Sequence, residues 1–541
     1  MENSELETII SGSQNNVQEL SRILTNFLKN NQNVFTFASL SENNKRVLLW
    51  TALFQLLQDK TITQVHALCL GTIRLLSRDK EDLKNLICEQ WISVLIEKAG
   101  LYSLVEMDNE TMVTLDALNK DIVVESVKCL CNLAFNSDVA RMLCVQSCIG
   151  EGLIARLRLF KDSAYKEEVM LYDVKLLFIL TILQPEFKMN VLYGMEYLIN
   201  CLKELVEESR SSVFGAGEDM DTGDQHCVIN DNKQAIACEI LKTQFNLIVH
   251  IKMDKVTETD STMFLKLVPL LATVLSVNAS SEQKLMELRS NVANLLTSVP
   301  SSYYSELTPI LKGGEIAQYV YDGYNMDAIQ ALIALLQYRL NITTNTTNQY
   351  INLSPVLTVF NKSSQGCRVQ RKYLRSVVLP PLRDVSLPPE KGNTLRNQLC
   401  RLLTTPVTGV RDLVAEFLFI LCKRNVGRMV KYTGFGNAAG HLAQKGLLGA
   451  VGNNMYSDSS DDSDTEEYLE AQPNIDPVVG CTRPPRVDPF EGMTEEQKEH
   501  EVMELVNLLD KLMSDGIVRP ARIGPDGKPI PLDHVMELQD K

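Results

Sequence analysis

The chain has 541 residues, of which 45% are hydrophobic and 22% charged, and its formal net charge is −15. This length is too great for one compact core and suits several domains or one solenoid of repeats. The acidic balance argues against nucleic acid as the main partner, because phosphate binding requires a basic face.

The sequence gives no signal for a membrane, a secretory route or a cofactor. No apolar run reaches the roughly 18 residues of a transmembrane helix, and the first residues, MENSELETII, lack a basic and apolar leader. The 13 cysteines form no C-x-x-C pair and do not cluster with histidines. We therefore expect reduced thiols in a cytosolic protein that holds no metal or cofactor.

The first 60 residues predict two or three helices with apolar stripes. One stripe comprises Leu20, Ile23, Leu24, Phe27 and Leu28, and the other comprises Leu48, Leu49, Leu53, Leu56 and Leu57. From residue 61 to about 430 an apolar helix and a polar break alternate, and no alternating run of residues predicts a convincing strand.

A polar pattern recurs on four of these helices. Residues 121–136 place Glu125, Lys128 and Asn132 on one face, opposite an apolar stripe. The same three slots recur as Gly71, Arg74 and Arg78, as Glu239, Lys242 and Asn246, and as Glu287, Ser290 and Asn294. The helices lie about 50 residues apart, near the roughly 40–47 of armadillo and HEAT units. Stacked repeats with one shared polar surface are thus predicted, and four ordinary amphipathic helices are the alternative.

Two insertions and one basic stretch interrupt the repeats. We expect residues 206–232, rich in Ser, Gly and Asp, to form a mobile surface loop, and residues 341–348 form an Asn/Thr tract. Residues 362–383 carry bases and no acid. Four of these bases share one helical face, which is either a solvated face or an anion-binding one: Arg368, Arg371, Lys372 and Arg375.

Residues 431–448, KYTGFGNAAGHLAQKGLL, contain three closely spaced glycines. Their spacing is G-x-G-x-x-x-G, no strand precedes them, and no P-loop lysine and serine follow. A close-packed turn into a short helix is therefore predicted in preference to a nucleotide site.

The last hundred residues change character. Residues 456–470 hold seven acids and no base, so we expect disorder there. Acids close after Ser457 and Ser463 match the preference of an acidophilic kinase. A Pro-rich linker follows over residues 471–492. A final helix is predicted over residues 494–513, capped by Thr494 and Gln497 and striped with apolar residues, which must dock on the body or on a partner.

Several segments together resemble the synembryn family, the "resistance to inhibitors of cholinesterase eight" proteins. They are VVESVKCLCNLAFNS, RLLSRDK, LYDVKLLFILT, VVLPPLRDV, AEFLFILCK, KYTGFGNAAGHLAQKGLL, YSDSSDDSDTEEY and EGMTEEQKEHE, in this order. The resemblance implies an all-α, armadillo/HEAT-like solenoid with a partly disordered tail and a terminal helix. It divides the chain into a solenoid over 1–430, a cap over 431–455, a linker over 456–492 and a helix with tail over 493–541.

The resemblance also implies a function. Family members are cytosolic chaperones and guanine-nucleotide exchange factors for heterotrimeric G-protein α subunits (Gα), acting without a receptor. In the family the C-terminal helix of Gα lies in the concave trough. Matching positions here are Arg74, Arg78, Asn132, Tyr172 (usually Phe), Phe178 and Phe245. The polar pattern adds Asn246 and Asn294 to this surface. Family phosphorylation sites match Ser457 and Ser463.

A mechanism follows from these residue types. Arg74 and Arg78 suit the terminal carboxylate of the Gα helix, and Asn132 and Asn246 suit its peptide groups. Tilting that helix would favour the nucleotide-free state, so GDP leaves without any bond being broken. Phosphates on the tail would dock on Arg368, Arg371, Lys372 and Arg375 and fix the terminal helix against Gα.

Two other functions compete with this one. An armadillo scaffold that binds extended peptides without exchange activity is the closer rival, although import carriers use Trp–Asn pairs, and neither Trp50 nor Trp91 precedes an Asn. The six histidines show no catalytic constellation, which argues against an enzyme. We expect a monomer in the cytoplasm that is recruited peripherally to the cell cortex or plasma membrane.

Overall fold

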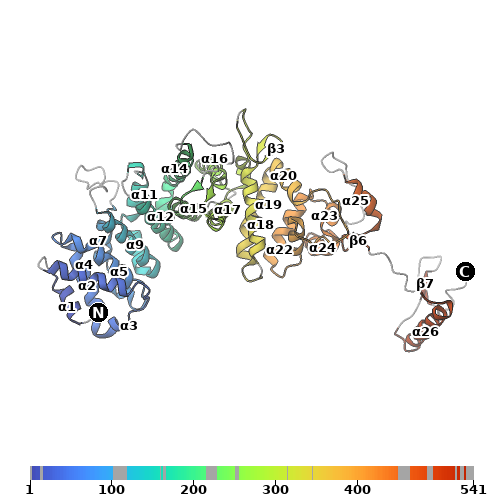
Figure 1. The fold of residues 1–541 in the computed structure, drawn as a ribbon, viewed down its shortest axis with the longest axis horizontal. Coiled ribbons are helices and arrows are strands. Elements are labelled where there is room, and N and C mark those ends of the chain that lie inside the picture. The colour runs from blue at the N-terminus through green and yellow to red at the C-terminus, as the bar shows by residue number, and fades with distance from the viewer. Residues whose placement is uncertain are drawn as a thin grey trace.

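The computed structural model of the chain describes residues 3–12, 16–101, 119–158, 160–162, 166–214, 228–249, 251, 255–313, 315–343, 345–448, 464–483, 492–517, 521–523 and 529–531. Within these ranges the chain is built almost entirely of α-helices, which stack into one long arc (Figure 1). The predicted all-α solenoid of armadillo/HEAT type is confirmed.

The arc begins with a bundle of short helices. These are α1 (Asn3–Ile10), α2 (Val17–Asn30), α3 (Ala38–Ser41), α4 (Lys45–Gln58), α5 (His66–Leu76), α6 (Leu83–Leu86) and α7 (Glu89–Ala99). The predicted stripe on α2 is buried from Leu20 to Phe27, as periodicity requires. On α4 the prediction is wrong for Leu48, which is 48% exposed, whereas Leu49 and Leu53 are fully buried.

The middle of the arc has two rows of helices (Figure 1). The inner row comprises α9 (Lys120–Asn136), α12 (Lys166–Leu183), α15 (Asp231–Ile248) and α17 (Glu282–Thr297), and α5 precedes it. The outer row comprises α10 (Asp138–Gln146), α11 (Ile149–Arg158), α13 (Phe187–Val191), α14 (Met195–Phe214) and α16 (Glu258–Leu275). The apolar stripes of both rows merge into one continuous core.

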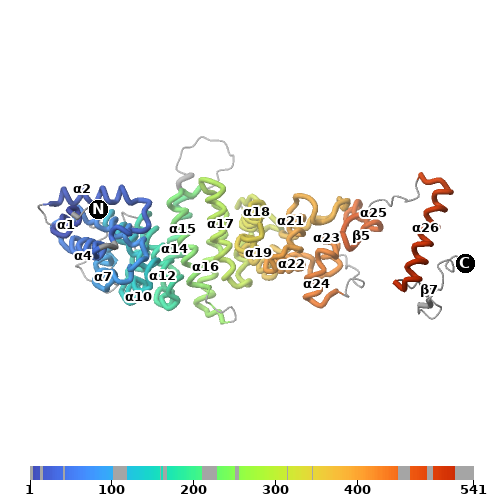
Figure 2. The backbone as a smooth tube through the Cα atoms, turned by 90° about the horizontal axis from the view of Figure 1, so that it is seen from below, coloured from blue at the N-terminus to red at the C-terminus, as the bar shows by residue number. Residues whose placement is uncertain are grey.

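The C-terminal part continues the stack and then leaves it. It comprises α18 (Asp327–Ile342), α19 (Gln349–Gly366), α20 (Arg368–Val378), α21 (Leu395–Leu402), α22 (Thr408–Leu421), α23 (Val426–Thr433), α24 (Phe435–Gln444), α25 (Glu466–Ala471) and α26 (Glu495–Ser514). In both overall views α26 stands apart from the solenoid (Figures 1 and 2), and none of its residues is buried.

Four small two-stranded pairs are the β structure of the described residues. They join β1 (Val228–Ile229) to β2 (Asn278–Ala279) in parallel, and β3 (Val320–Tyr321) to β4 (Tyr324–Asn325), β5 (Ile475–Asp476) to β6 (Cys481–Thr482) and β7 (Ala521–Ile523) to β8 (Pro529–Pro531) in antiparallel register. Most strands have two residues, too short for the alternation by which strands are recognised in a sequence.

Side-chain caps explain where several helices begin. Asn119 accepts hydrogen bonds from the main-chain N–H groups of Asp121 and Ile122 at the start of α9, and Asn230 caps α15 in the same way. Thr494 and Gln497 form the predicted capping box of α26. Each cap satisfies main-chain donors that the first turn of a helix leaves without partners.

Two predicted loops are partly helical. Residues 206–214 of the expected insertion belong to α14, and residues 215–227 lie outside the described ranges. The expected disorder of residues 456–470 does not hold for its last part, because Thr465 caps α25 and donates its hydroxyl to Leu382 O at 2.5 Å. Among the described helices, none is long and apolar enough to cross a lipid bilayer.

Candidate functional site

Side-chain amides fix the register between neighbouring helices of the inner row. Asn132 Nδ2 on α9 donates to the main-chain carbonyl of Arg74 on α5 at 3.1 Å, and Asn136 Nδ2 donates to Ser77 O at 2.9 Å. The two donors on α9 follow each other along the chain in the same order as the two carbonyls that they meet at α5. The helices α9 and α5 therefore run parallel. The predicted polar face therefore also holds two repeats together.

A charge cluster lies beside this amide. Arg74 Nε donates to Glu125 Oε2 at 2.7 Å, and Lys128 Nζ lies 3.0 Å from Glu125 Oε1. Lys128 Nζ also lies 4.8 Å from the centre of the Tyr172 ring on α12. The three charged side chains are between 19% and 27% exposed, so one carboxylate serves two partly buried cations. The predicted face is thus half-buried, and its charges already pair with one another.

The same arrangement recurs two helices further along. Lys242 on α15 pairs with Glu239 at 3.0 Å and lies 5.8 Å from the centre of the Phe178 ring on α12. Asn246 Nδ2 donates to Thr181 Oγ1 at 3.2 Å and to Phe178 O at 3.4 Å. Phe245 is half-buried beside this group and packs against the core. The repeated motif therefore produces a repeated contact as well as a repeated helix.

We name these side chains the inner surface. It comprises Arg74, Arg78, Glu125, Lys128, Asn132, Tyr172, Phe178, Lys242 and Phe245. The prediction that Asn246 lies on this exposed face is wrong, because Asn246 is only 5% exposed. Asn294 on α17 lies further along the same row and is exposed, and its neighbour Ser290 accepts a hydrogen bond from Arg339 Nη2 at 2.7 Å. The amides of Asn132 and Asn246 have an internal partner that the sequence pattern did not predict, because the acceptors lie on other helices.

Arg78 lies at the edge of the inner surface. Its Nη1 donates to Gln32 O at 2.7 Å, and its guanidinium lies 5.4 Å from the centre of the Phe35 ring. Burial lowers the pKa of Arg78, and the nearby charge of Arg74 lowers it further. An arginine has five N–H donors, so an incoming carboxylate still finds donors on both side chains. The two guanidinium groups thus have more N–H donors than their internal contacts use.

Two exposed aromatic rings were missed by sequence reasoning. Phe35 is 65% exposed under Arg78, and Phe135 is 60% exposed with Lys80 Nζ 5.7 Å from its ring centre. Phe135 belongs to the motif helix α9, but only the packed structure shows that it faces solvent. Exposed rings next to cations are typical anchors for a partner protein.

The four predicted bases on α20 share one helix but differ in their surroundings. Arg368 is exposed, Arg371 Nη1 donates to Ser364 O at 2.7 Å, and Lys372 Nζ lies 4.0 Å from Asp322 Oδ2. Arg375 interacts with Tyr432 on α23, whose pKa is raised by burial against the effect of this arginine. Lys362 is separate from this face, because it donates to Thr297 O and Val299 O at the end of α17.

The tail returns to the solenoid immediately after the predicted phosphorylation sites. Asp464 pairs with the partly buried Lys431 on α23, and Lys431 Nζ lies 4.2 Å from the centre of the Tyr468 ring on α25. Asp464 also contributes to raising the pKa of Tyr432, the residue that Arg375 contacts. Ser457 and Ser463 themselves lie outside the described residues, although Ser463 directly precedes Asp464.

The glycine-rich turn is packed against the chain itself. Gly434 has a φ of +74° between α23 and α24, and a Cβ there would lie 2.9 Å from Val479 O. The N–H groups of Phe435 and Gly436 donate to Pro477 O and Val478 O, both at 2.9 Å. A bound phosphate would need these first N–H groups of α24. The predicted close-packed turn is thus confirmed, with its donors already in use.

Neither the cysteines nor the possible metal ligands of the described residues form a reactive site. The 12 described cysteines are free, and burial raises the pKa of Cys69, Cys144 and Cys422 to about 12 each, which keeps these thiols protonated. No group of three or more His, Cys, Asp or Glu side chains within the described ranges is arranged to hold a metal ion.

Comparison with known proteins extends over nearly the whole chain. Residues 69–528 match the family described as "Guanine nucleotide exchange factor synembryn". A protein of Drosophila melanogaster named "Chaperone Ric-8" is 34% identical over 96% of this chain and 95% of its own length. "Chaperone Ric-8A" of Xenopus tropicalis is 36% identical over 98% of this chain and 96% of its own length. Among solved structures, an engineered protein matches 83% of the chain at 12% identity with a TM-score of 0.42.

Proposed function

The chain belongs to the family of the guanine nucleotide exchange factor synembryn, whose curated members are named as chaperones, and from this premise we propose that it is a chaperone and exchange factor for Gα subunits. In this proposal the inner surface grasps the C-terminal helix of Gα. The observation that carries it is the repeated pairing of a cation with an aromatic ring along α9, α12 and α15: Lys128 over Tyr172, and Lys242 near Phe178.

The chemistry of such a helix fits this surface. A C-terminal helix ends in a carboxylate and in carbonyl groups that have no partner within the helix. Arg74 and Lys128 meet at Glu125, and an incoming carboxylate would share or replace that acid between the two cations. The rings of Tyr172, Phe178 and Phe245 offer apolar area for the side chains of the helix. The surface therefore recognises both the charge and the apolar face of its partner.

Exchange follows from differential binding and requires no covalent step. A surface that holds the terminal helix of Gα in a displaced position binds the nucleotide-free form better than the GDP-bound form. By linkage, GDP then binds more weakly to the complex, and GTP rebinding releases the chaperone. The same preference for an incomplete Gα would protect a nascent subunit before it has acquired nucleotide. The protein is thus a binding protein and not an enzyme that makes or breaks bonds.

The tail supplies a second contact in this proposal. An acidophilic kinase would phosphorylate Ser457 and Ser463, and the phosphates would dock on the basic face of α20, namely Arg368, Arg371, Lys372 and Arg375. Support comes from Asp464, which follows Ser463 and acts on the same Tyr432 as Arg375 does. The exposed apolar side chains of α26, among them Val502 and Leu505 at 46% and 63% exposure, would then meet Gα.

The proposed setting is that of the family. We expect a monomer that acts in the cytoplasm and reaches the cell cortex or plasma membrane through its Gα partner. Signalling by G proteins at these places would then proceed without a receptor.

The test is the rate of GDP release from purified Gα subunits of two classes. We expect the protein to accelerate release from at least one class, and Arg74→Ala/Arg78→Ala to reduce the acceleration by about tenfold or more, because two charge-assisted contacts are lost. Lys266→Ala in the outer row is the matched control, since Lys266 pairs with Glu196 away from the inner surface. Circular dichroism would confirm that the variants remain folded.

An armadillo scaffold without exchange activity is the alternative function. It is favoured if the protein binds the Gα terminal peptide, loses this binding in the double variant, and yet leaves GDP release from every Gα unchanged. Unchanged acceleration in the folded double variant would instead refute the inner surface as the binding site.

A further inference from the structure

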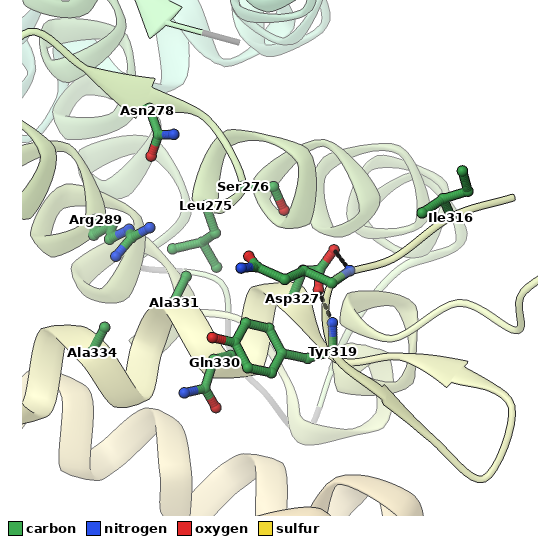
Figure 3. A pocket seen from close by; sticks show the side chains of 11 residues that line it. Leu275, Ser276, Asn278, Arg289, Ile316, Tyr319, Asp327, Gln330, Ala331 and Ala334 are labelled. Carbon is green, nitrogen blue, oxygen red and sulfur yellow. Dashed lines mark hydrogen bonds between the residues drawn. The ribbon is translucent and has the colours of Figure 1, made fainter. Parts of the chain in front are cut away.

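The solenoid contains a pocket of about 560 Å³ whose lining residues are not part of the inner surface (Figure 3). Its walls come from the end of α16, from β2, from α17 and α18, and from the segment that leads into β3. Its lining side chains include Leu275, Asn278, Arg289, Tyr319, Gln330 and Ala331. This volume is within the range of about 300–1,000 Å³ that is usual for small-molecule sites.

Arg289 on α17 is a cation without a partner in this pocket. Its Nε is buried and has no hydrogen-bond partner, and within the described part of the chain no carboxylate forms an ion pair with it. Burial alone lowers its pKa, with no neighbouring charge contributing. Arg156 on α11, by contrast, has a side chain that is 9% exposed and pairs with Asp173. The side chain of Arg289 as a whole is half-buried, and because taking a charge out of water is costly unless the charge is paired, Arg289 calls for an anion.

The surrounding polar groups are held in place and point into the same space. Asn278 is fixed by the pairing of β2 with β1, where it lies opposite Val228. The N–H of Tyr319 donates to Asp327 Oδ1 at 2.7 Å, which anchors that residue while its ring extends toward Gln330 and Ala331 (Figure 3). Arg289 and Asn278 face this ring across Leu275 in the same view. Three different types of hydrogen-bonding group thus surround one apolar floor.

Among the described residues that line the pocket, Asp327 is the one acid, and its carboxylate is already hydrogen-bonded to the main chain. Its two oxygens accept main-chain hydrogen bonds from Tyr319, at 2.7 Å, and from Gln318, at 3.3 Å. In Figure 3 it lies on the far side of the pocket from Arg289. The carboxylate therefore holds the segment before β3 in position and leaves the positive charge of Arg289 uncompensated.

We propose that this pocket binds a small organic acid, whose carboxylate or phosphate pairs with Arg289 while its carbon skeleton rests on Leu275 and Ala331. A guanidinium matches both kinds of oxyanion in bidentate geometry. Asn278 and the hydroxyl of Tyr319 supply further donors to the same group. Since the walls come from α16, α17, α18 and the β3 segment, a bound acid adds a contact among these elements.

Binding is tested with three defined probes: succinate, glycerol 2-phosphate and inorganic phosphate. Calorimetric titration of the full chain should detect one site, and Arg289→Gln should weaken the preferred probe at least tenfold. Arg22→Gln, which removes an exposed arginine on α2, should leave that affinity unchanged. Tyr319→Phe should weaken binding several-fold. The ranking of succinate against the two phosphates identifies the class of acid.

Thermal unfolding provides a second, independent readout. Arg289→Gln should raise the Tm of the ligand-free protein, because an unpaired, half-buried charge is removed, and should abolish the probe-dependent rise expected in the unmodified protein. Unchanged probe affinity in Arg289→Gln overturns the proposal. A lowered ligand-free Tm together with no binding of any probe also overturns it, since Arg289 would then be a structural residue.

An acidic side chain of the same chain is the other possible source of the oxyanion that pairs with Arg289. A variant that lacks the acids before β1 distinguishes this source from a free ligand. Residues 215–227, which precede β1 in the sequence, contain four acids that can be changed to their amides: Glu218, Asp219, Asp221 and Asp224. If this fourfold variant binds the probes as the unmodified protein does, the free-ligand proposal stands. If it binds them at least tenfold more tightly and cancels the effect of Arg289→Gln on Tm, the chain's own acids are the partner and the proposal is overturned.

Discussion

Arg74 Nε on α5 donates to Glu125 Oε2 on α9 at 2.7 Å, a contact between residues 51 positions apart in the sequence. Glu125 thus occupies the position that a ligand carboxylate would take between Arg74 and Lys128. Glu125→Gln should release both cations and increase the affinity for a Gα C-terminal peptide about two- to fivefold, the value of a partly exposed ion pair. Fluorescence anisotropy with the labelled peptide measures the change.

Two controls make this measurement specific. The same peptide with an amidated C-terminus should show no gain, because it lacks the charge that competes with Glu125. Glu196→Gln in the outer row, where Glu196 pairs with Lys266 at 2.7 Å, should leave peptide affinity unchanged. Weaker binding of the free-acid peptide to Glu125→Gln would show that Glu125 organises the cations and does not compete for them.

The amides of the inner row should differ in their effect on stability. Asn132→Ala should lower the free energy of unfolding by about 1 kcal/mol, because its hydrogen bond to Arg74 O is lost. Asn294→Ala should change it by less than about 0.5 kcal/mol, because Asn294 is exposed. Urea unfolding compares the two variants. If Asn132→Ala and Asn294→Ala lower the free energy of unfolding equally, the hydrogen bond of Asn132 to Arg74 O adds nothing to stability.

The glycines of the cap should respond in opposite directions to alanine. Gly434→Ala should destabilise the protein by about 1–3 kcal/mol, because a side chain at positive φ is strained and its Cβ would lie 2.9 Å from Val479 O. Gly440→Ala should stabilise it by about 0.5–1 kcal/mol, since no atom lies within 4 Å of the added Cβ inside α24. Thermal unfolding of both variants checks the signs.

His66 should make stability fall on acidification. Its Nε2 lies 3.0 Å from both Leu56 O and Asp59 O, and burial lowers its pKa, with Lys98 adding to the effect. Below the ordinary pKa of about 6.5, the unfolded chain therefore binds a proton that the folded chain refuses. The free energy of unfolding should drop by up to about 1.4 kcal/mol per pH unit in this range and stay constant above it.

His66→Gln isolates this contribution, because glutamine does not titrate and still offers an N–H donor. The difference in free energy of unfolding between His66 and His66→Gln should shrink between pH 7.5 and pH 5.5. An unchanged difference over this interval would show that His66 titrates alike in both states.

The gain in Gα binding that follows phosphorylation of the tail should depend on the basic face of α20. Alanine at Arg368, Arg371, Lys372 and Arg375 should remove the gain in Gα binding that kinase treatment produces, because phosphates lose their cations. Arg411→Ala on α22 is the matched control, since Arg411 is a surface base that pairs with its neighbour Asp412. If the fourfold variant keeps the full gain, the phosphates dock elsewhere.

Periodicity alone predicted most of the inner row. The spacing of Glu125, Lys128 and Asn132 placed them on one face of α9, and the structure confirms both the helix and its buried stripe. The acceptor of Asn132 was beyond reach of that reasoning, because the carbonyl of Arg74 lies 58 positions earlier and any polar helix face shows the same pattern. A local pattern defines a face, whereas only packing defines what meets it.

The pocket cation was missed for a related reason. Arg289 stands next to Ser290 of the motif, and in sequence it is one more base on a surface helix. Its lack of a partner depends on what α16, α18 and the β3 segment place around it. The acidic tail shows the converse case: its composition predicted disorder, but Thr465, Lys431 and Tyr468 give residues 464–471 a fixed place.

The segment that follows α25 has a consequence for assembly. The last unit of a stack of repeats exposes the face on which a further unit of the same kind can pack. Here residues 475–482 cover that end, and their carbonyls accept the N–H groups of Phe435 and Gly436. Before a second molecule can pack on this face, these hydrogen bonds have to break. The segment therefore opposes end-to-end polymerisation of the chain.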